Sequence, residues 1–285
     1  MSSERIVYDQ QQVYIFGERL RGVQSCSASW SAPEAYVNSI GVTGGTVGSV
    51  VEEALRADFE VERLMITPHD PMIDFFDRID LSGEIHYGSA GNNFAFNGGY
   101  VTSYSCACAI GEIPSLNFAI AAYGDSGGGA PSLGRGAEKD HTIIVARPGS
   151  ISLDVDGFDS NAIQSFEISL SVNKTPMSII GDLKPVHFVT NFPIEVDCQF
   201  TLNVQDYQSS RLFDFICNPK SQNLNFNFSE CAGGQTIRSF FMPNAKLVDY
   251  NQSAQIGSEF QATFTYKILI TNEQNIKKML SGQAF

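Results

Sequence analysis

The most regular feature of this chain is a strict alternation of hydrophobic and polar residues over long segments. Residues 194–205 carry a hydrophobic side chain at every second position, with acidic, amide or hydroxyl side chains between them. Residues 165–172 and 260–268 follow the same rule. A period of two over such lengths is typical of antiparallel strands with one dry face and one solvated face. The pattern therefore predicts an all-β protein.

The alternating segments occur twice along the chain. The segment 23–31 has its later counterpart at 163–171, and the segment 104–118 has its later counterpart at 250–264. Matched positions share side chains as well as the pattern. Duplicated modules commonly build pseudo-symmetric rings or arrays. We therefore expect a duplicated β-sandwich or half-barrel domain, with one short helix in each copy, that assembles into a large ring barrel.

The predicted domain organisation has four parts. They are a first copy at residues 1–123, a glycine-rich linker at 124–140, a second copy at 141–270 and a C-terminal tail at 271–285. Two copies agree with a length of 285 residues, because each half is long enough to bury its own core.

Short helices are predicted at three places. Asp70-Pro71 is typical of a helix start, with a capping carboxylate followed by proline at the first helical position. The counterpart in the second copy is predicted to start near Asp206. After Asn272, an acidic residue at Glu273 and two later lysines favour a helix in the tail, because they match the helix dipole.

The two copies differ most between their first long strands. Residues 44–55 are glycine-rich and predict a long loop with a helical turn at 50–55, where the second copy has Lys184-Pro185-Val186-His187. Such a loop would expose apolar side chains, so we expect it to contact a neighbouring subunit. The candidate contact residues are Thr46, Val47, Val50, Val51 and Leu55.

Charge and composition narrow the function classes. The formal net charge is −13 and Lys and Arg form no cluster, which argues against a conventional nucleic-acid-binding surface. The polar start at residues 1–12 predicts no signal peptide, and no apolar run approaches the length of a membrane span. The six cysteines include no C-x-x-C pair and indicate small buried side chains rather than disulfides or a metal site.

One segment resembles a catalytic motif. Residues 124–128 read Gly-Asp-Ser-Gly-Gly, as in the nucleophile segment of trypsin-like serine proteases. That chemistry needs a histidine base, and neither His69 nor His86 lies in the surroundings that this family places around its base. The segment is better explained as part of the linker. We therefore predict no enzyme activity, no cofactor and no metal.

The duplication and the two-faced strands resemble the tail tube proteins of long-tailed bacteriophages, in the variety with two fused tube domains. The resemblance covers nearly the whole chain and rests on pattern, because this family has no diagnostic short motif. It implies that three chains form a ring with pseudo-sixfold symmetry. Four strands per domain would then give 4 × 2 × 3 = 24 strands around one barrel, and stacked rings would form a hollow tube that conducts DNA during ejection.

The same resemblance implies the partners and the location of the protein. The chain would bind copies of itself and other tail proteins, namely the tape measure, terminator and distal tail proteins, and no membrane. DNA would pass through the lumen without specific binding. The protein would belong to the virion tail and assemble in the host cytoplasm. Tube, terminator and baseplate positions share the fold, so the position along the tail stays open.

Six polar residues are the candidates for the lumen wall. They share the wet phase of matched strands and are Asp58, Glu60, Glu62, Glu195, Asp197 and Gln199. An acidic wall suits the passage of a duplex, because a basic wall would hold phosphates. Arg63 should point the other way, to a subunit interface.

A second interpretation is an adhesive or carbohydrate-binding double β-sandwich, such as a receptor-binding or decoration protein. It would also show alternating strands. It needs clustered exposed aromatic rings to stack on sugars. The single Trp30 instead lies on the apolar phase of its segment.

Overall fold

The structure is a computed structural model of the 285-residue chain. It describes residues 11–32, 34–38, 43, 46–51, 55–65, 70–86, 93–128, 150–155, 158–160, 163–180, 182, 184–203, 221–229, 236–253 and 260–283. Strands dominate these residues, and all of their pairings are antiparallel, which confirms the predicted all-β class.

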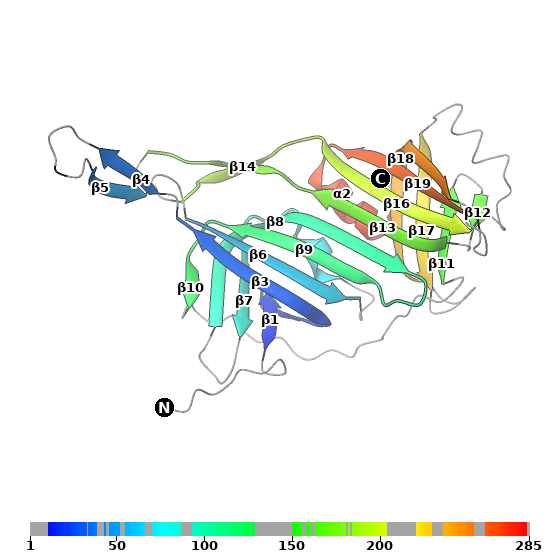
Figure 1. Cartoon of the computed structure of the whole chain (residues 1–285), viewed down its shortest axis with the longest axis horizontal. Helices are drawn as coiled ribbons and strands as arrows, with labels where there is room; N and C mark the ends of the chain where they lie inside the picture. Colours follow the sequence, from blue (N-terminus) through cyan, green and yellow to red (C-terminus); the bar gives the residue numbers. More distant parts are fainter. Residues whose placement is uncertain are drawn as a thin grey trace.

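Each half of the chain is built around one long strand that passes through two layers (Figure 1). The strands of the first half that form these layers are β1 (Gln12–Ile15), β2 (Glu18–Leu20), β3 (Val23–Ser31), β6 (Arg56–Leu64), β7 (Leu81–His86), β8 (Asn93–Ala109) and β9 (Ser115–Ala122). The first part of β8 pairs with β7, which leads through β1 to β2. The second part of β8 pairs with β9, which leads through β6 to β3. The layer that contains β7, β1 and β2 is called the outer layer below, and the layer that contains β9, β6 and β3 is called the inner layer.

The second half repeats these pairings. Its strands are β11 (Ile151–Val155), β12 (Phe158–Ser160), β13 (Ile163–Ser171), β16 (Ile194–Asn203), β17 (Gln222–Ser229), β18 (Thr236–Ser253) and β19 (Gln261–Ile270). The first part of β18 pairs with β17, which leads through β11 to β12. The second part pairs with β19, which leads through β16 to β13. The two halves therefore have one topology.

The irregularities of the strands are repeated as well. A bulge interrupts β3 at Gln24, and its counterpart interrupts β13 at Gln164. A second bulge interrupts β8 at Thr102, and its counterpart interrupts β18 at Val248. A chain that bulges at matched positions turns its side chains over at the same points. The counterpart of a residue in β3 is therefore found by adding 140 to its number, and the counterpart of a residue in β8 by adding 146.

The core of each half lies between its two layers. In the second half, Phe166 of β13 packs on Phe226 of β17 with ring centroids 4.4 Å apart. In the first half, Phe59 of β6 packs on Phe96 in the first part of β8, at 5.0 Å. These rings occupy the hydrophobic positions of the alternating segments and are buried. Burial of one face of each strand leaves the opposite face of the inner layer in solvent.

The helices agree with their sequence signals where the structure describes them. A 3-10 helix, η2 (Pro71–Phe75), is capped by Asp70, whose side chain accepts a hydrogen bond from the Met72 amide at 3.1 Å. The tail helix, α2 (Glu273–Leu280), is capped in the same way by Asn272. The helix predicted near Asp206 lies outside the described residues.

Two hairpin arms project from the inner layers. Arm one consists of β4 (Glu34–Asn38) and β5 (Thr46–Val51), and arm two consists of β14 (Lys174–Met177) and β15 (His187–Thr190). Figure 1 shows arm one extending away from the body. The predicted long loop with a helical turn at 50–55 is therefore wrong for Thr46–Val51, which is the second strand of a hairpin. The β-branched residues of this segment favour a strand, whereas the prediction of a loop relied on its glycines.

The start of the predicted linker also has regular structure. Ser126–Gly128 forms a short strand, β10, which pairs with the first part of β8. Gly127 has φ = 134°, a backbone conformation that favours glycine. Residues 129–149 lie outside the described residues, and the domain boundaries remain a prediction. Among the described residues, no helix is long and apolar enough to cross a membrane.

Candidate assembly edges and polar face

A continuous sheet joins the two halves. β13 of the second half pairs with β8 of the first over seven residue pairs, from Ser165–Ala109 to Ser171–Ser103. The result is an inner sheet of eight strands in the order β3-β6-β9-β8-β13-β16-β19-β18, four from each half. This contact between the halves is called the internal junction below. It shows how one copy of the module docks on another.

The two ends of the inner sheet carry the same strands that meet at the internal junction. β3 is the counterpart of β13 and pairs only with β6 among the described residues. The second part of β18 is the counterpart of β8 and pairs only with β19 there. Unpaired strand edges present rows of free backbone donors and acceptors and are templates for pairing with another chain. One end of the sheet is thus complementary to the other.

Exposure of side chains marks the β3 edge as incomplete. Leu170 of β13 is 4% exposed, whereas its counterpart Trp30 in β3 is 63% exposed. Both residues lie on the apolar phase of their strands, and the difference is that Leu170 has a neighbouring module while Trp30 has none among the described residues. The β3 edge thus exposes an aromatic ring at the position where the contact between the halves buries Leu170.

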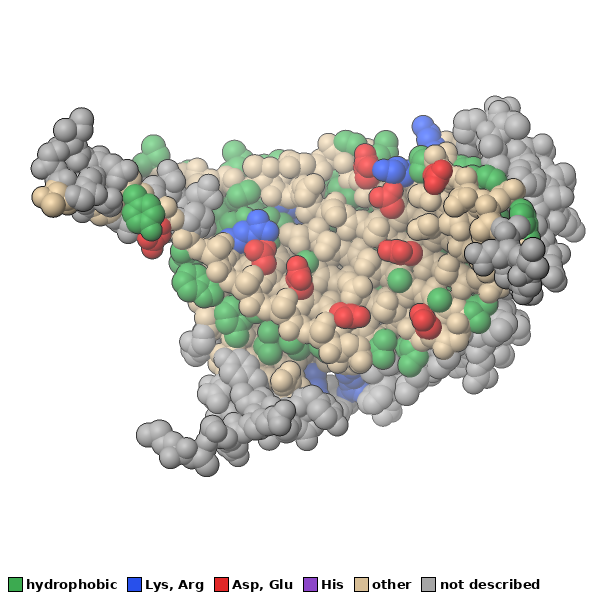
Figure 2. All heavy atoms as spheres, in the orientation of Figure 1, with side chains coloured by type: hydrophobic (Ala, Val, Ile, Leu, Met, Phe, Trp, Pro, Cys, Tyr) green, Lys and Arg blue, Asp and Glu red, His purple; other side chains and the backbone are tan. Residues whose placement is uncertain are grey.

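All six predicted lumen residues lie on the solvated face of the inner sheet, called the polar face below. Asp58, Glu60 and Glu62 belong to β6, and Glu195, Asp197 and Gln199 belong to β16. All six are half-buried or exposed, while their strand neighbours of the other phase are buried. Figure 2 shows a broad face of mainly uncharged polar groups with scattered acidic side chains and few basic ones.

The polar face also holds bases that the sequence analysis missed. Arg56 contacts Asp58 at 2.7 Å, and Lys267 of β19 lies 3.2 Å from Glu195 and 3.5 Å from Asp197. The alternation of polar and hydrophobic residues in β19 could have identified Lys267 as a residue of the polar face, and Lys267 pairs with Asp197 across the strands. Part of the acidic charge is therefore compensated, while Glu60 and Glu62 belong to no ion pair among the described residues.

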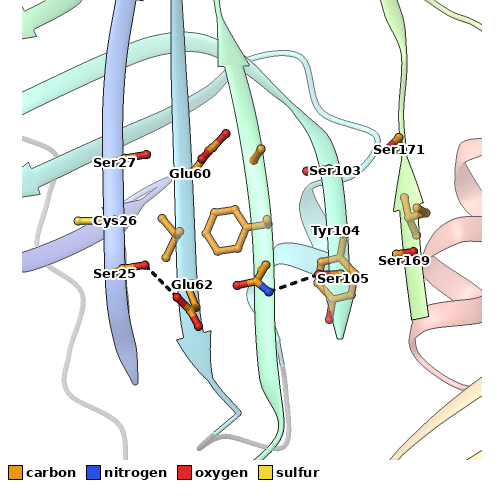
Figure 3. Close-up of a pocket in the computed structure, with 15 residues that line it drawn as sticks. Ser25, Cys26, Ser27, Glu60, Glu62, Ser103, Tyr104, Ser105, Ser169 and Ser171 are labelled. Atoms are coloured by element: carbon orange, nitrogen blue, oxygen red, sulfur yellow. Dashed lines mark hydrogen bonds between the residues drawn. The ribbon is translucent and has the colours of Figure 1, made fainter. Parts of the chain in front are cut away.

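The polar face is hollowed where the first half meets the second. A shallow hollow of about 450 Å³ is lined by strands β3, β6, β9, β8 and β13. Its polar lining is made largely of serines (Figure 3), namely Ser25, Ser27, Ser103, Ser105, Ser169 and Ser171. Ser25 donates a hydrogen bond to Glu62 at 3.1 Å, and Cys26 points away from the hollow. These short hydroxyl side chains add no charge to the wall of the hollow, whose charged side chains are Glu60 and Glu62.

A buried polar cluster links the first half of the chain to Arg238 of the second half. Asp70 forms an ion pair with Arg63 and accepts a hydrogen bond from the Tyr104 hydroxyl at 2.9 Å. Arg238, from β18 of the second half, donates to the same hydroxyl at 3.0 Å. The expectation that Arg63 faces a subunit interface is wrong, because it points away from the polar face into the core. The sequence shows the direction of this side chain but not its partner.

The titration of Asp70 follows from this cluster. Burial raises the pKa of the carboxyl, but Arg63, Arg238, the Met72 amide and the Tyr104 hydroxyl lower it more, so its pKa lies below the usual value. A carboxylate with a lowered pKa in the folded state contributes stability above its unfolded pKa of about 4, and this contribution is lost as the pH falls through the folded pKa.

Replacing Asp70 by Ala is expected to destabilise the chain by about 3–5 kcal/mol at pH 7, because two buried guanidinium groups lose their counter-ion. The measurement is denaturant unfolding. The difference between the variant and the wild type should shrink below about pH 4. Asp58→Ala is the control, since that carboxylate is exposed, and should shift stability by only about 0.5 kcal/mol. Equal losses in both variants would contradict the role of the cluster.

The described residues offer little reactive chemistry. Burial raises the pKa of the Cys106 and Cys108 thiols to about 12, and raises that of Cys198 well above its usual value. Such thiols stay protonated and are poor nucleophiles or ligands. Ser126 lies in the paired strand β10. No group of three or more His, Cys, Asp or Glu in the described part of the chain could hold a metal ion.

Comparison with solved structures finds a partial similarity to one named protein. The structure of Hcp1 from Flavobacterium johnsoniae is 17% identical in sequence, and the match covers 42% of this chain and 93% of that chain with a TM-score of 0.28. No protein-family profile matches the sequence, and no curated protein is significantly similar to it.

Proposed function

We propose that the protein is a structural subunit of a tube: three chains close into a ring with pseudo-sixfold symmetry, and rings stack into a hollow tail tube that conducts DNA. The observation that carries this proposal is the internal junction. It displays one module docked on the next, and both ends of the inner sheet repeat the surfaces that form it. A chain with two complementary ends joins others head to tail, and such contacts give rings when the rotation closes.

The internal junction supplies the register of the contact between chains. Subtracting 140 from the β13 side and adding 146 on the β8 side converts its pairs into pairs between β3 of one chain and β18 of the next. The described pairs would be Ser27–Ser253, Ala28–Gln252, Ser29–Asn251, Trp30–Tyr250 and Ser31–Asp249. In this register Trp30 meets an aromatic partner at the position where Leu170 meets Tyr104.

Closure would remove both open edges at once. Four inner strands in each half would give 24 strands around a ring of three chains. A barrel of this size does not fill its interior with side chains and encloses water. The polar face would then line the lumen, which agrees with its serines and its excess of acids over bases. Such a wall would let a duplex slide without holding its phosphates.

Negative-stain electron microscopy of the purified protein, combined with light scattering, tests the proposal. We expect hollow rings or tubes with a repeating mass of three times 31.1 kDa. An adhesive β-sandwich would give monomers or compact oligomers without a central channel. A protein that stays monomeric at every concentration would contradict the ring. Rings of another chain number would contradict the trimer and leave the edge pairing in place.

A further inference from the structure

Arm two of the chain rests on the first half of the same chain. The Phe188 ring lies 5.0 Å from the Tyr100 ring and 5.5 Å from the Tyr123 ring, between centroids. The Tyr100 hydroxyl donates a hydrogen bond to the Lys174 carbonyl at 3.3 Å. As a result Tyr100, which lies on the polar face of β8, is only 3% exposed. Tyr100 and Tyr123 thus form a seat for arm two, called the inner seat.

The second half carries the counterpart of this seat without an arm on it among the described residues. Adding 146 to Tyr100 and Tyr123 gives Lys246 and Leu269, called the outer seat. Lys246 is exposed and Leu269 is 60% exposed. The charged side chains that accompany Lys246 on this part of the polar face are Lys267, Glu195, Asp197 and Asp249, and Glu195 and Asp197 already contact Lys267. The described ion pairs of the chain do not include Lys246.

The two arms have the same register. Glu34 pairs with Val51 in arm one as Lys174 pairs with Thr190 in arm two, and the shift along β4 is again 140. Glu34 is therefore the counterpart of Lys174, and Tyr36, two residues on and on the same face, is the counterpart of Pro176. Glu34 is exposed and Tyr36 is 69% exposed. Arm one thus presents an acid and an aromatic ring that no described part of the chain covers.

We infer that arm one of one chain docks on the outer seat of the neighbouring chain, with Glu34 paired to Lys246 and Tyr36 covering Leu269. This inference rests on the ring proposed above and names a contact within it. The occupant is a second copy of this chain, because the internal junction continues into the contact between arm two and the inner seat. If the next pair of modules around the ring repeats the contact between arm two and the inner seat, arm one of one chain lies on the outer seat of its neighbour.

The charges support this occupant and exclude the other arm. In the internal junction the Lys174 ammonium is 5.6 Å from the centre of the Tyr100 ring and 2.9 Å from Glu273 of its own half. At the outer seat a cation replaces Tyr100, so an arm that carried a lysine would be repelled, while the arm that carries Glu34 is attracted. The pairing would give each arm one correct seat and would prevent the halves from joining out of order.

Charge reversal tests the contact in the full-length chain. Lys246→Glu and Glu34→Lys should each raise the concentration needed for assembly at least about tenfold, because each places like charges at the contact. The combined variant, Glu34→Lys with Lys246→Glu, should restore assembly close to that of the wild type. Lys278→Glu reverses an exposed lysine of the tail helix and should leave assembly unchanged. Sedimentation across a concentration series gives these values.

The outcomes separate this contact from the ring itself. If the wild type assembles and both single reversals assemble like it, or the combined variant stays as weak as the single ones, the contact is wrong while the ring stands. If the wild type never assembles, both fail. A direct reading comes from Glu34→Cys with Lys246→Cys under oxidation, which should link chains into covalent trimers. The contact would be wrong if oxidation linked no chains in the variant that carries both cysteines and none in a mixture of the two variants that carry one cysteine each.

Discussion

A chain in which Ala28 is replaced by proline should fold and remain monomeric. In the internal junction, the Val172 amide donates to the Thr102 carbonyl at 2.7 Å, so the even-numbered amides of β13 face the neighbouring module. Ile168 is one of these, and Ala28 is its counterpart in β3. The Ala28 amide therefore faces the open edge. Proline removes this donor and places its ring where the next strand would lie, which an edge strand tolerates and a central strand does not.

Light scattering and electron microscopy should show single chains at concentrations where the wild type is fully assembled. Ala28→Ser keeps the amide and should assemble. Ser27→Pro is the opposite case, because its amide faces β6 inside the chain, and it should lower the stability of the monomer by about 3 kcal/mol or more. If Ala28→Pro assembled like the wild type, the edge of β3 would have no part in the contact between chains.

The second large effect concerns the polar face. Replacing Glu60 and Glu195 by Lys puts two new cations on this face in each chain, six in a ring of three. Lys267 also loses one of its two acidic contacts, which adds to the effect. Folding should be nearly unaffected, because both acids are exposed. Assembled tubes should then retain duplex DNA at low salt and release it as the salt concentration rises, since phosphate contacts displace counter-ions.

The matched control changes the net charge by the same amount elsewhere. Glu18→Lys with Asp80→Lys alters two exposed acids of the outer layer. DNA retention by tubes of the wild type and of both variants is measured across a salt series. Only the variant of the polar face should retain DNA. Equal retention by the two variants would mean that Glu60 and Glu195 do not line a channel.

Local patterns in the sequence predict much of this fold because the strands are two-faced. The alternation over 194–205 corresponds to β16, and Asp70 and Asn272 cap helices as their neighbours indicate. Each of these features depends on residues close together in the chain. The repeat at shifts of 140 and 146 also reaches the bulges, because a bulge is fixed by the side chains that must return to the core.

Contacts between distant segments could not be predicted in the same way. Arg63 and Arg238 come from different halves of the chain and meet around Asp70 and Tyr104, and nothing near either arginine indicates the other. The strand Thr46–Val51 was hidden by the glycines around it, since its pairing with β4 outweighs their weak propensity. The compensation of the acids by Lys267 likewise depends on which strand lies next to β16.

The covalent link across the internal junction has a consequence for the order of the assembly reaction. Six separate modules would have to meet to close one ring, whereas three fused chains already contain half of the six junctions. The concentration of closed rings would then rise with the third power of free chain rather than the sixth. Each chain would enter with its two modules held at a high effective concentration, so the loss of translational freedom on ring closure is correspondingly smaller. Dilute protein would therefore still close rings at concentrations where unlinked modules would remain apart.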